Sequence, residues 1–445
     1  MNNNKDLLLI GTENHVIMIN CNLSNKDFSL AKNIIQTEDS INQIKLMHKP
    51  NSTQEILTVV DNSGEIVVLT IDLISDINKR TKTNKYEVVN TKKYNAKIEF
   101  HDNSPWSVDC QYPYIIIGSN NKTVFVYNYE EDNIINNDNN ISKNSVIYKG
   151  NSNNIPYVTI SDNGCFIGNN SIDKSFKIFD FYTGDLIVSE KNPKNEWGWG
   201  LKFVPKNLFR IKDFEFENLE LKKDTNLINP ALKLYKIDEQ NLDNPSNYDE
   251  NEFDKISYDE LDDYEKYLKI NLIDKYYILS STNHRAGLYK LDFKQIDDSH
   301  KKKVVAIPLG KIELTRIYIR DLYMENFNID YGMMYNINSI YQSSRYEFIF
   351  YSKNMNLILF GSKAGDLHVF EMNIYHDKKN KMIGIEDEPN ILISFGSKIA
   401  GMKFLENEDE NGRKIIDIFV ITLAGVFYYY KIFPDNNFWE SHFEE

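Results

Sequence analysis

Apolar and polar positions along this chain follow one arrangement that recurs seven times. Each instance is an apolar run that ends in small residues, then a tight polar turn, then a second apolar and aromatic run. β-Branched and aromatic residues suit a pleated sheet, and Gly, Asn, Ser and Asp suit a tight turn. The pattern therefore predicts seven β-hairpins, at residues 7–21, 56–72, 114–129, 165–180, 276–292, 357–372 and 417–432.

The spacing of the hairpins favours a repeat fold. Successive hairpins begin 49, 58, 51, 111, 81 and 60 residues apart, near or above the ~40 to 45 residues of a four-stranded propeller blade. One hairpin cannot bury its own apolar face, so repeated units must stack side by side. We predict an all-β, seven-bladed, WD-like β-propeller that forms a single domain over residues 1–445. The alternative is a pair of β-sandwiches or another all-β array.

The WD-type signature itself is weak. Neither a Gly-His nor a Trp-Asp dipeptide occurs, and Phe179-Asp180, Tyr127-Asn128 or Phe370-Glu371 stands where Trp-Asp would be expected.

Alternating segments before six of the hairpins predict the first strand of a blade. Only six residues precede the first hairpin. We therefore expect either that residues 438–443 supply the first strand of blade one or that the sequence lacks its true start. The six predicted first strands are residues 41–47, 106–111, 155–160, 199–204, 346–351 and 399–405.

Two connections are unusually long. Residues 205–275 form a predicted insertion in blade five, between its first strand and its hairpin. Between Asp238 and Glu265 the chain has twelve acidic residues and one Lys, a net charge of −11, which leaves −3 of the total −14 elsewhere. This composition predicts that residues 238–254 are disordered. Residues 132–154 are Asn-rich and predict a surface loop with one weak strand at residues 145–149.

The end of the predicted insertion has a helical pattern. Ser257 and Glu260 have the spacing of a capping box, and Leu261, Tyr264 and Leu268 fall on one face of a short helix. Such a helix either packs beside the propeller or docks a partner.

Composition excludes several classes of partner. No basic stripe of the kind that binds nucleic acid is present, no run approaches the ~20 apolar residues of a membrane span, and the N-terminus has no export signal. We expect an intracellular protein of the nucleus, the cytoplasm or both, with protein partners and without membrane or direct nucleic-acid binding. Cys21, Cys110 and Cys165 have no close pairing and predict small, buried, reduced residues.

Motifs for catalysis are missing from the sequence. The eight histidines have no metal-ligand spacing, and no phosphate-binding loop, nucleophile elbow or dinucleotide fingerprint occurs. We predict a protein that is not an enzyme and needs no cofactor or metal. A propeller enzyme remains the alternative, and it would need polar side chains that converge on the central channel.

Tryptophans are the sharpest candidates for a binding site. Trp106, Trp197 and Trp199 each stand where a first strand begins. They either wedge between blades as core residues or expose an aromatic anchor to a partner, as interface hot spots do. The candidate partner-binding residues are Trp106, Asn154, Pro156, Trp197 and Trp199.

Around these tryptophans the chain resembles the fungal Crt-ten family, named for constitutive ribonucleotide reductase transcription. The motifs that carry the resemblance follow in order between about residues 100 and 205. The acidic insertion has no counterpart, and the family's longer N-terminal segment is missing. The motifs are SPWSVD at 104–109, GSNNKTVFVY at 118–127, NIPYV at 154–158, the aromatic-Asp ending of 172–180, and WGWG at 197–200.

The resemblance implies a WD-like negative regulator of ribonucleotide reductase gene transcription, linked to the DNA-damage response and to cullin-type ubiquitin ligase assemblies. Since the chain has no basic DNA-reading element, such an effect would act through protein partners. We therefore predict a non-enzymatic interaction scaffold or adaptor. The alternative within binding proteins is a scaffold for trafficking or complex assembly.

Overall fold

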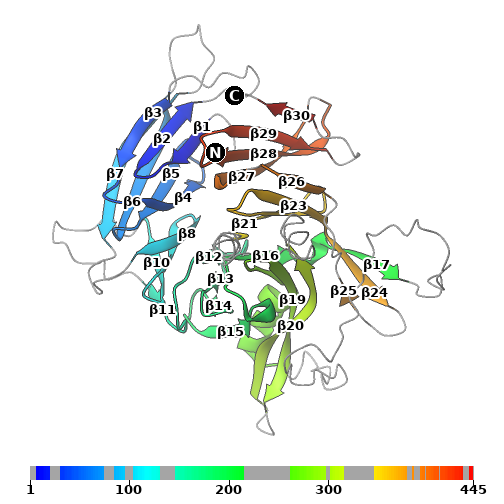
Figure 1. Cartoon of the computed structure of the whole chain (residues 1–445). Helices are drawn as coiled ribbons and strands as arrows, with labels where there is room; N and C mark the ends of the chain where they lie inside the picture. Colours follow the sequence, from blue (N-terminus) through cyan, green and yellow to red (C-terminus); the bar gives the residue numbers. More distant parts are fainter. Residues whose placement is uncertain are drawn as a thin grey trace, which may run out of the picture. The chain divides into compact units, whose positions relative to one another are not determined.

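A computed structural model describes residues 7–20, 31–74, 85–95, 104–130, 146–214, 261–296, 301–314, 345–377, 383–384, 391–395, 397–409, 411–433 and 440–443. The chain divides into two compact units, residues 1–186 (unit 1) and residues 187–445 (unit 2). Within them, seven antiparallel sheets follow one another along the chain, and an eighth, smaller sheet stands apart (Figure 1). These seven sheets are the blades of a seven-bladed β-propeller, as the hairpin pattern predicts.

Unit 1 contains the first three blades and most of the fourth. In each blade, strands that are consecutive in sequence are hydrogen-bonded neighbours. Blade one has three described strands. The strands are β1 (Leu7–Gly11), β2 (His15–Asn20) and β3 (Ala31–Gln36); β4 (Ile41–His48), β5 (Glu55–Asp61), β6 (Glu65–Ile74) and β7 (Lys85–Asn95); β8 (Pro105–Gln111), β9 (Tyr114–Ser119), β10 (Val124–Asn128) and β11 (Val146–Tyr148); and β12 (Tyr157–Ile160), β13 (Phe166–Asn170), β14 (Ser175–Asp180) and β15 (Leu186–Lys191).

Unit 2 contains blades five, six and seven. Short 3-10 turns, η3 (Pro193–Asn195) and η4 (Lys206–Leu208), flank the first strand of blade five. The strands are β16 (Gly200–Pro205), β18 (Tyr276–Ser281), β19 (Arg285–Ile296) and β20 (Lys301–Glu313); β21 (Phe348–Tyr351), β22 (Leu357–Gly361), β23 (Asp366–Glu371) and β26 (Ile391–Ser394); and β27 (Ile399–Glu408), β28 (Lys414–Thr422), β29 (Phe427–Ile432) and β30 (Glu440–Phe443). All seven predicted hairpins are confirmed by these pairings.

The C-terminal strand does not complete blade one. β30 pairs with β29, with Tyr428 opposite Phe443, and is the fourth strand of blade seven. The expectation that residues 438–443 supply the first strand of blade one is therefore wrong. Pairing with β29 satisfies an edge that the aromatic strand β29 would otherwise expose.

The predicted insertion in blade five contains a strand that the sequence pattern does not reveal. β17 (Arg210–Phe214) pairs in parallel with β24 (Asn373–Asp377), and β24 pairs with β25 (Ile383–Gly384), which makes the small extra sheet. Its partner lies far away in sequence, so no local signal predicts it. The predicted disordered segment, residues 238–254, lies outside the described residues, as do residues 131–145 of the Asn-rich loop.

The helix at the end of the insertion begins later than predicted. α1 (Asp263–Leu268) is capped by Asp262, whose carboxylate accepts from the Glu265 amide while the Glu265 side chain accepts from the Asp262 amide. The capping box of α1 is therefore formed by Asp262 with Glu265 and not by the predicted pair, Ser257 with Glu260. Both pairs have the same spacing, but Asp262 stands directly before the helix. Ser257 and Glu260 themselves lie outside the described residues.

This helix packs against blade five. α1 continues into a π-helical turn, η8 (Lys269–Ile273), which contacts β18 and β19, and Leu268 and Ile273 are buried. Lys302 of β20 lies 3.1 Å from the Glu265 carboxylate. Tyr264, which the pattern places on the buried face, is 39% exposed.

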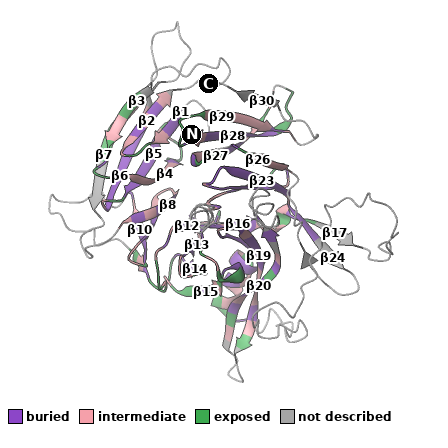
Figure 2. Ribbon diagram, viewed as in Figure 1, coloured by how far each residue is buried: buried purple, intermediate pink, exposed green. Residues whose placement is uncertain are grey.

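Neighbouring blades share their cores. Ile116 and Val124 of blade three pack with Ile155, Val158 and Ile167 of blade four. Figure 2 shows the middle strands of the sheets as mostly buried. Because each blade is apolar on both faces, a single blade cannot be stable alone.

The small residues that end the apolar runs have a packing role. A Cβ on Gly118 would lie 2.8 Å from the Ile155 carbonyl oxygen of blade four, and a Cβ on Gly361 would lie 2.5 Å from the Met402 sulfur of blade seven. Glycine therefore allows the next blade to approach closely.

Candidate functional site

A residue with a side-chain oxygen ends the first strand of each of the seven hairpins or stands directly after it. In blade four, Ser171 N donates to Ser175 O at 3.1 Å, and the Ser171 hydroxyl accepts from the Asp173 amide. Equivalent side-chain and backbone bonds recur around the other turns. These residues are Thr12, Asp61, Ser119, Ser171, Thr282, Ser362 and Thr422.

These turns share one edge of each blade with the segment that leads into the first strand, because the four strands alternate in direction. We call this edge the turn edge and the segment the lead-in. Backbone bonds fix the lead-ins to the turns. Ile172 N donates to Asn154 O at 3.0 Å in blade four, and Lys363 N donates to Arg345 O at 3.0 Å in blade six. All five predicted binding residues lie at this edge.

Trp106 is half-buried near the start of β8. Its neighbours are held by blade two, since Asn42 Nδ2 donates to the Pro105 carbonyl oxygen at 2.7 Å and to Ser104 Oγ at 3.1 Å. This position joins two blades of unit 1.

Asn154 and Pro156 are half-buried in the lead-in of blade four. The Asn154 carbonyl oxygen accepts from the Ser171 hydroxyl at 2.8 Å as well as from Ile172 N. The backbone of this lead-in is thus hydrogen-bonded to the turn of its own blade.

Trp199 is only 2% exposed. Its indole N–H donates to the Asn283 side chain, and the Arg345 guanidinium lies 4.2 Å from its ring. A buried indole with its N–H satisfied is a packing residue. The core interpretation therefore applies to Trp199.

Trp197 lies against Trp199 but reaches the surface. The two rings meet edge to face with centroids 6.4 Å apart, and Trp197 is 37% exposed. Of the five predicted residues, the structure brings these two into contact. The other three belong to unit 1.

The lead-in that presents Trp197 is firmly anchored. Glu196 binds Arg285 and accepts from Thr282 Oγ1 at 2.6 Å, so it ties the lead-in to the turn of its own blade. Asn192 Nδ2 donates to the Glu196 carbonyl oxygen at 3.3 Å, and Ser280 Oγ donates to Asn192 Oδ1 at 2.8 Å. The anchored backbone holds Trp197 at low entropic cost to binding.

Sequence reasoning missed Glu196, Arg285 and Arg345. The Glu196 contacts cross 86 and 89 residues of sequence, so no local motif marks them. The one available signal was position, because Arg345 directly precedes the residues predicted as the first strand of blade six.

A propeller enzyme would need convergent polar side chains, and the first strands of blades two and three bring one such pair together. Lys45 of β4 lies 2.7 Å from Asp109 of β8, whose oxygens also accept from the amides of Cys110 and Ile160. The carboxylate therefore ties blades two, three and four together. Its neighbour Cys110 is held protonated, since burial and the nearby Asp109 raise the pKa of the thiol to about 12. A thiol in that state is a poor nucleophile.

The described histidines, cysteines and acidic residues were the other candidates for catalysis or metal binding. His368 of β23 is buried, and its Nε2 lies 2.9 Å from Tyr346 Oη. Cys110 and Cys165 are free and half-buried, not fully buried as predicted; Cys21 lies outside the described residues. Within the described ranges no group of three His, Cys, Asp or Glu residues could hold a metal ion. The described part of the chain also has no helix with the length and apolarity to span a bilayer.

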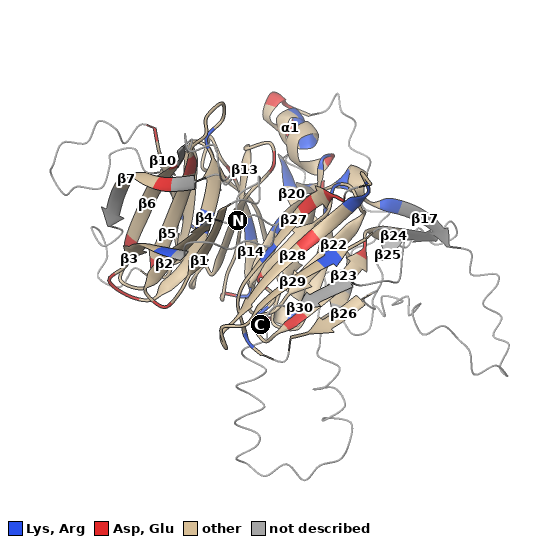
Figure 3. Cartoon of the chain, turned by 90° about the horizontal axis from the view of Figure 1, so that it is seen from above, with Lys and Arg blue, Asp and Glu red and all other residues tan. Residues whose placement is uncertain are grey.

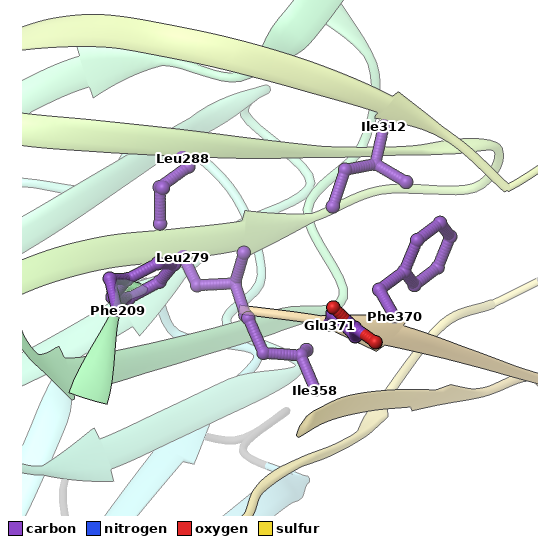
Figure 4. Close-up of a pocket in the computed structure, with 7 residues that line it drawn as sticks. All are labelled: Phe209, Leu279, Leu288, Ile312, Ile358, Phe370 and Glu371. Atoms are coloured by element: carbon purple, nitrogen blue, oxygen red, sulfur yellow. The ribbon is translucent and has the colours of Figure 1, made fainter. Parts of the chain in front are cut away.

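A cavity between blades five and six is too small for a ligand. Its volume is about 10 Å³, roughly one water molecule. Its walls carry apolar side chains and one carboxylate, that of Glu371 (Figure 4). The lining residues are Phe209, Leu279, Leu288, Ile312, Ile358, Phe370 and Glu371.

Charge is mixed over the described strands. Figure 3 shows Lys and Arg (blue) interspersed with Asp and Glu (red) along strands whose residues are mostly uncharged (tan). The described strands therefore do not carry charge of a single sign.

Comparison with known proteins supports no closer assignment. No protein-family model and no curated protein matches the chain. Among solved structures, a chain of the mitotic checkpoint complex is 7% identical, covering 96% of this chain and 84% of that chain, with a TM-score of 0.48. Saccharomyces cerevisiae Sqt1 is 9% identical, covering 99% of this chain and 83% of that chain, with a TM-score of 0.48. Partners do not transfer at these identities, and the fold is assigned from the sheets themselves.

Proposed function

We propose that this chain is a non-enzymatic protein-interaction scaffold whose partner binds the turn edge of blade five. The observation that carries the proposal is the exposed Trp197, held against the buried Trp199 by an anchored lead-in. An aromatic side chain with a rigid support is the usual form of an interface hot spot.

The resemblance to the Crt-ten family supports a more specific role. Under that proposal the partners are components of transcription control or of a cullin-type ubiquitin ligase, and the chain lowers ribonucleotide reductase gene transcription in the DNA-damage response. A trafficking or assembly scaffold would instead capture coat or membrane-associated proteins. Affinity purification followed by mass spectrometry distinguishes the two roles by the identity of the partner.

The partner identified in this way allows a direct test of Trp197. We expect Trp197→Ala to weaken capture of the partner by ~2 kcal/mol or more while thermal stability changes little. Tyr182→Ala is the matched control, because Tyr182 is an aromatic residue that is 72% exposed in the turn after β14. It should retain capture.

Trp199→Ala should behave differently. Truncation of a buried aromatic residue costs roughly 3 to 5 kcal/mol of stability, so any loss of binding should follow unfolding. Full capture by Trp197→Ala, or equal loss in the Tyr182 control, would remove Trp197 from the site.

A further inference from the structure

A continuous row of contacts begins at Trp197 and crosses all three blades of unit 2. Its ring contacts Trp199, and the Trp199 ring in turn contacts Arg345 in the lead-in of blade six. The Arg345 carbonyl oxygen accepts from Lys363 N, in the turn of the same blade. The path from blade five to blade six is thus made of direct contacts.

The same row of contacts continues into blade seven. The Lys363 carbonyl oxygen accepts from Ile399 N at 3.0 Å, and Lys363 Nζ donates to the Ala400 carbonyl oxygen at 3.2 Å. Lys398, next to Ile399, accepts through its carbonyl oxygen from Leu423 N at 2.8 Å. We call this row the basic ridge; it consists of Trp197, Arg345, Lys363, Lys398 and Leu423.

Positive charge on the basic ridge is only partly neutralised. The carboxylates of the two lead-ins are already engaged, Glu196 by Arg285 and Glu347 by Lys363. Arg345 and Lys398 form no ion pair with any described residue. The Arg345 guanidinium lies 4.2 Å from the centre of the Trp199 ring, and its N–H groups can bind a carboxylate.

Apolar side chains stand at both ends of the basic ridge. Trp197 is 37% exposed at one end, and Leu423 is 68% exposed at the other, beside Val426 at 36%. Cations between two apolar anchors complement a chain that carries carboxylates and apolar side chains together.

We infer that the basic ridge binds an acidic peptide segment that carries apolar side chains. This inference deepens the proposed function by naming the chemistry of the partner. A nucleic acid would satisfy the cations but would leave the aliphatic Leu423 without a matching contact, so the peptide is favoured.

The test uses fluorescence anisotropy with the full chain and a fluorescein-labelled peptide of alternating Asp and Glu around one central Leu. We expect saturable binding that weakens as salt rises. Lys398→Glu should weaken binding ~tenfold, because it places a like charge against the peptide. Leu423→Ser should weaken binding several-fold. Replacing the Leu of the peptide by Ala should weaken its binding to the wild type by the same factor.

Two variants at other sites of unit 2 are the matched controls. Lys275→Glu makes the same charge change at an exposed residue directly before β18, and Ile270→Ser removes an exposed apolar side chain from η8. Both should bind the peptide like the wild type. Absence of binding by the wild type, or equal loss in the controls, would overturn the inference.

Other occupants of the basic ridge give distinct results. Tighter binding of a labelled single-stranded oligonucleotide with the same dependence on Lys398 would assign the surface to nucleic acid. Peptide binding that requires deletion of residues 317–342 would assign it to this chain, and a dimer abolished by Lys398→Glu would assign it to a second copy. Each of these overturns the inference. The scaffold proposal would survive if Trp197→Ala still lost the cellular partner.

Discussion

The turns of blades four and five are closed by different means. In both, a hydroxyl residue ends or follows the second strand and closes the turn, with Ser171 N donating to Ser175 O at 3.1 Å and Thr282 N donating to Arg285 O at 2.7 Å. In blade four a carboxylate inside the turn, Asp173, completes the network. In blade five the carboxylate comes from Glu196 in the lead-in.

The two networks differ in burial and in sequence separation. Asp173 accepts from the amides of Ser175 and Ser152 and pairs with Lys177 at 3.1 Å, with side chains 6% and 5% exposed. The Glu196 and Arg285 side chains are 19% and 16% exposed and lie 89 residues apart. The ion pair of blade four is therefore more buried and joins residues that are close in sequence. The ion pair of blade five is more exposed to solvent and joins residues that are far apart in sequence. A distant anchor forms only after the blade has closed around its long insertion.

The largest expected effect is at Asp173. Asp173→Ala removes several hydrogen bonds and leaves the buried Lys177 ammonium without its carboxylate, so we expect a loss of ~3 kcal/mol in the free energy of unfolding. Urea unfolding measures it. Asp185→Ala, at an exposed Asp in the next turn of the same blade, is the control and should change little. A loss below about 1 kcal/mol would mean that burial does not set the strength of the anchor.

A smaller effect is expected at Glu196. Glu196→Ala should cost ~2 kcal/mol, because water reaches its partner Arg285 more readily than it reaches Lys177. A double-mutant cycle with Arg285→Ala isolates the pair from other contacts of either side chain. If the coupling energy equals or exceeds that of Asp173 with Lys177, the contrast between the two blades fails.

The smallest expected effect is the change in the stability contribution of Asp173 as the pH falls. Burial alone would raise the pKa of Asp173, but hydrogen bonds from Ser175 and Ser152 and the charge of Lys177 hold it below the usual 3.8. A carboxyl with a depressed folded pKa stabilises the fold above its unfolded pKa, and that contribution is lost as pH falls through the folded pKa. Asp173→Asn should therefore be less stable than the wild type near neutral pH, and the gap should shrink below pH 3.8. A gap that is constant with pH would contradict the shift.

Features that depend on a few adjacent residues could be predicted from the sequence. The hairpins are confirmed because alternation and turn chemistry are local. The helix was correct in kind and misplaced at its start, since Ser257 with Glu260 and Asp262 with Glu265 have the same capping pattern and only the helix geometry separates them. β17 was missed because its partner β24 lies far away in sequence, between the third and fourth strands of blade six.

The binding candidates show the same division. The sequence alone determined that Trp197 and Trp199 stand before a first strand, and that the blades are seven. The tertiary structure decided which indole is buried: Trp199 contacts Arg345 and Asn283 and is 2% exposed, while Trp197 is 37% exposed. It also decided that Glu196 anchors a turn across 86 residues of sequence. Strand and turn preferences arise from neighbouring residues, whereas burial and ion pairing depend on groups that only the folded chain brings together.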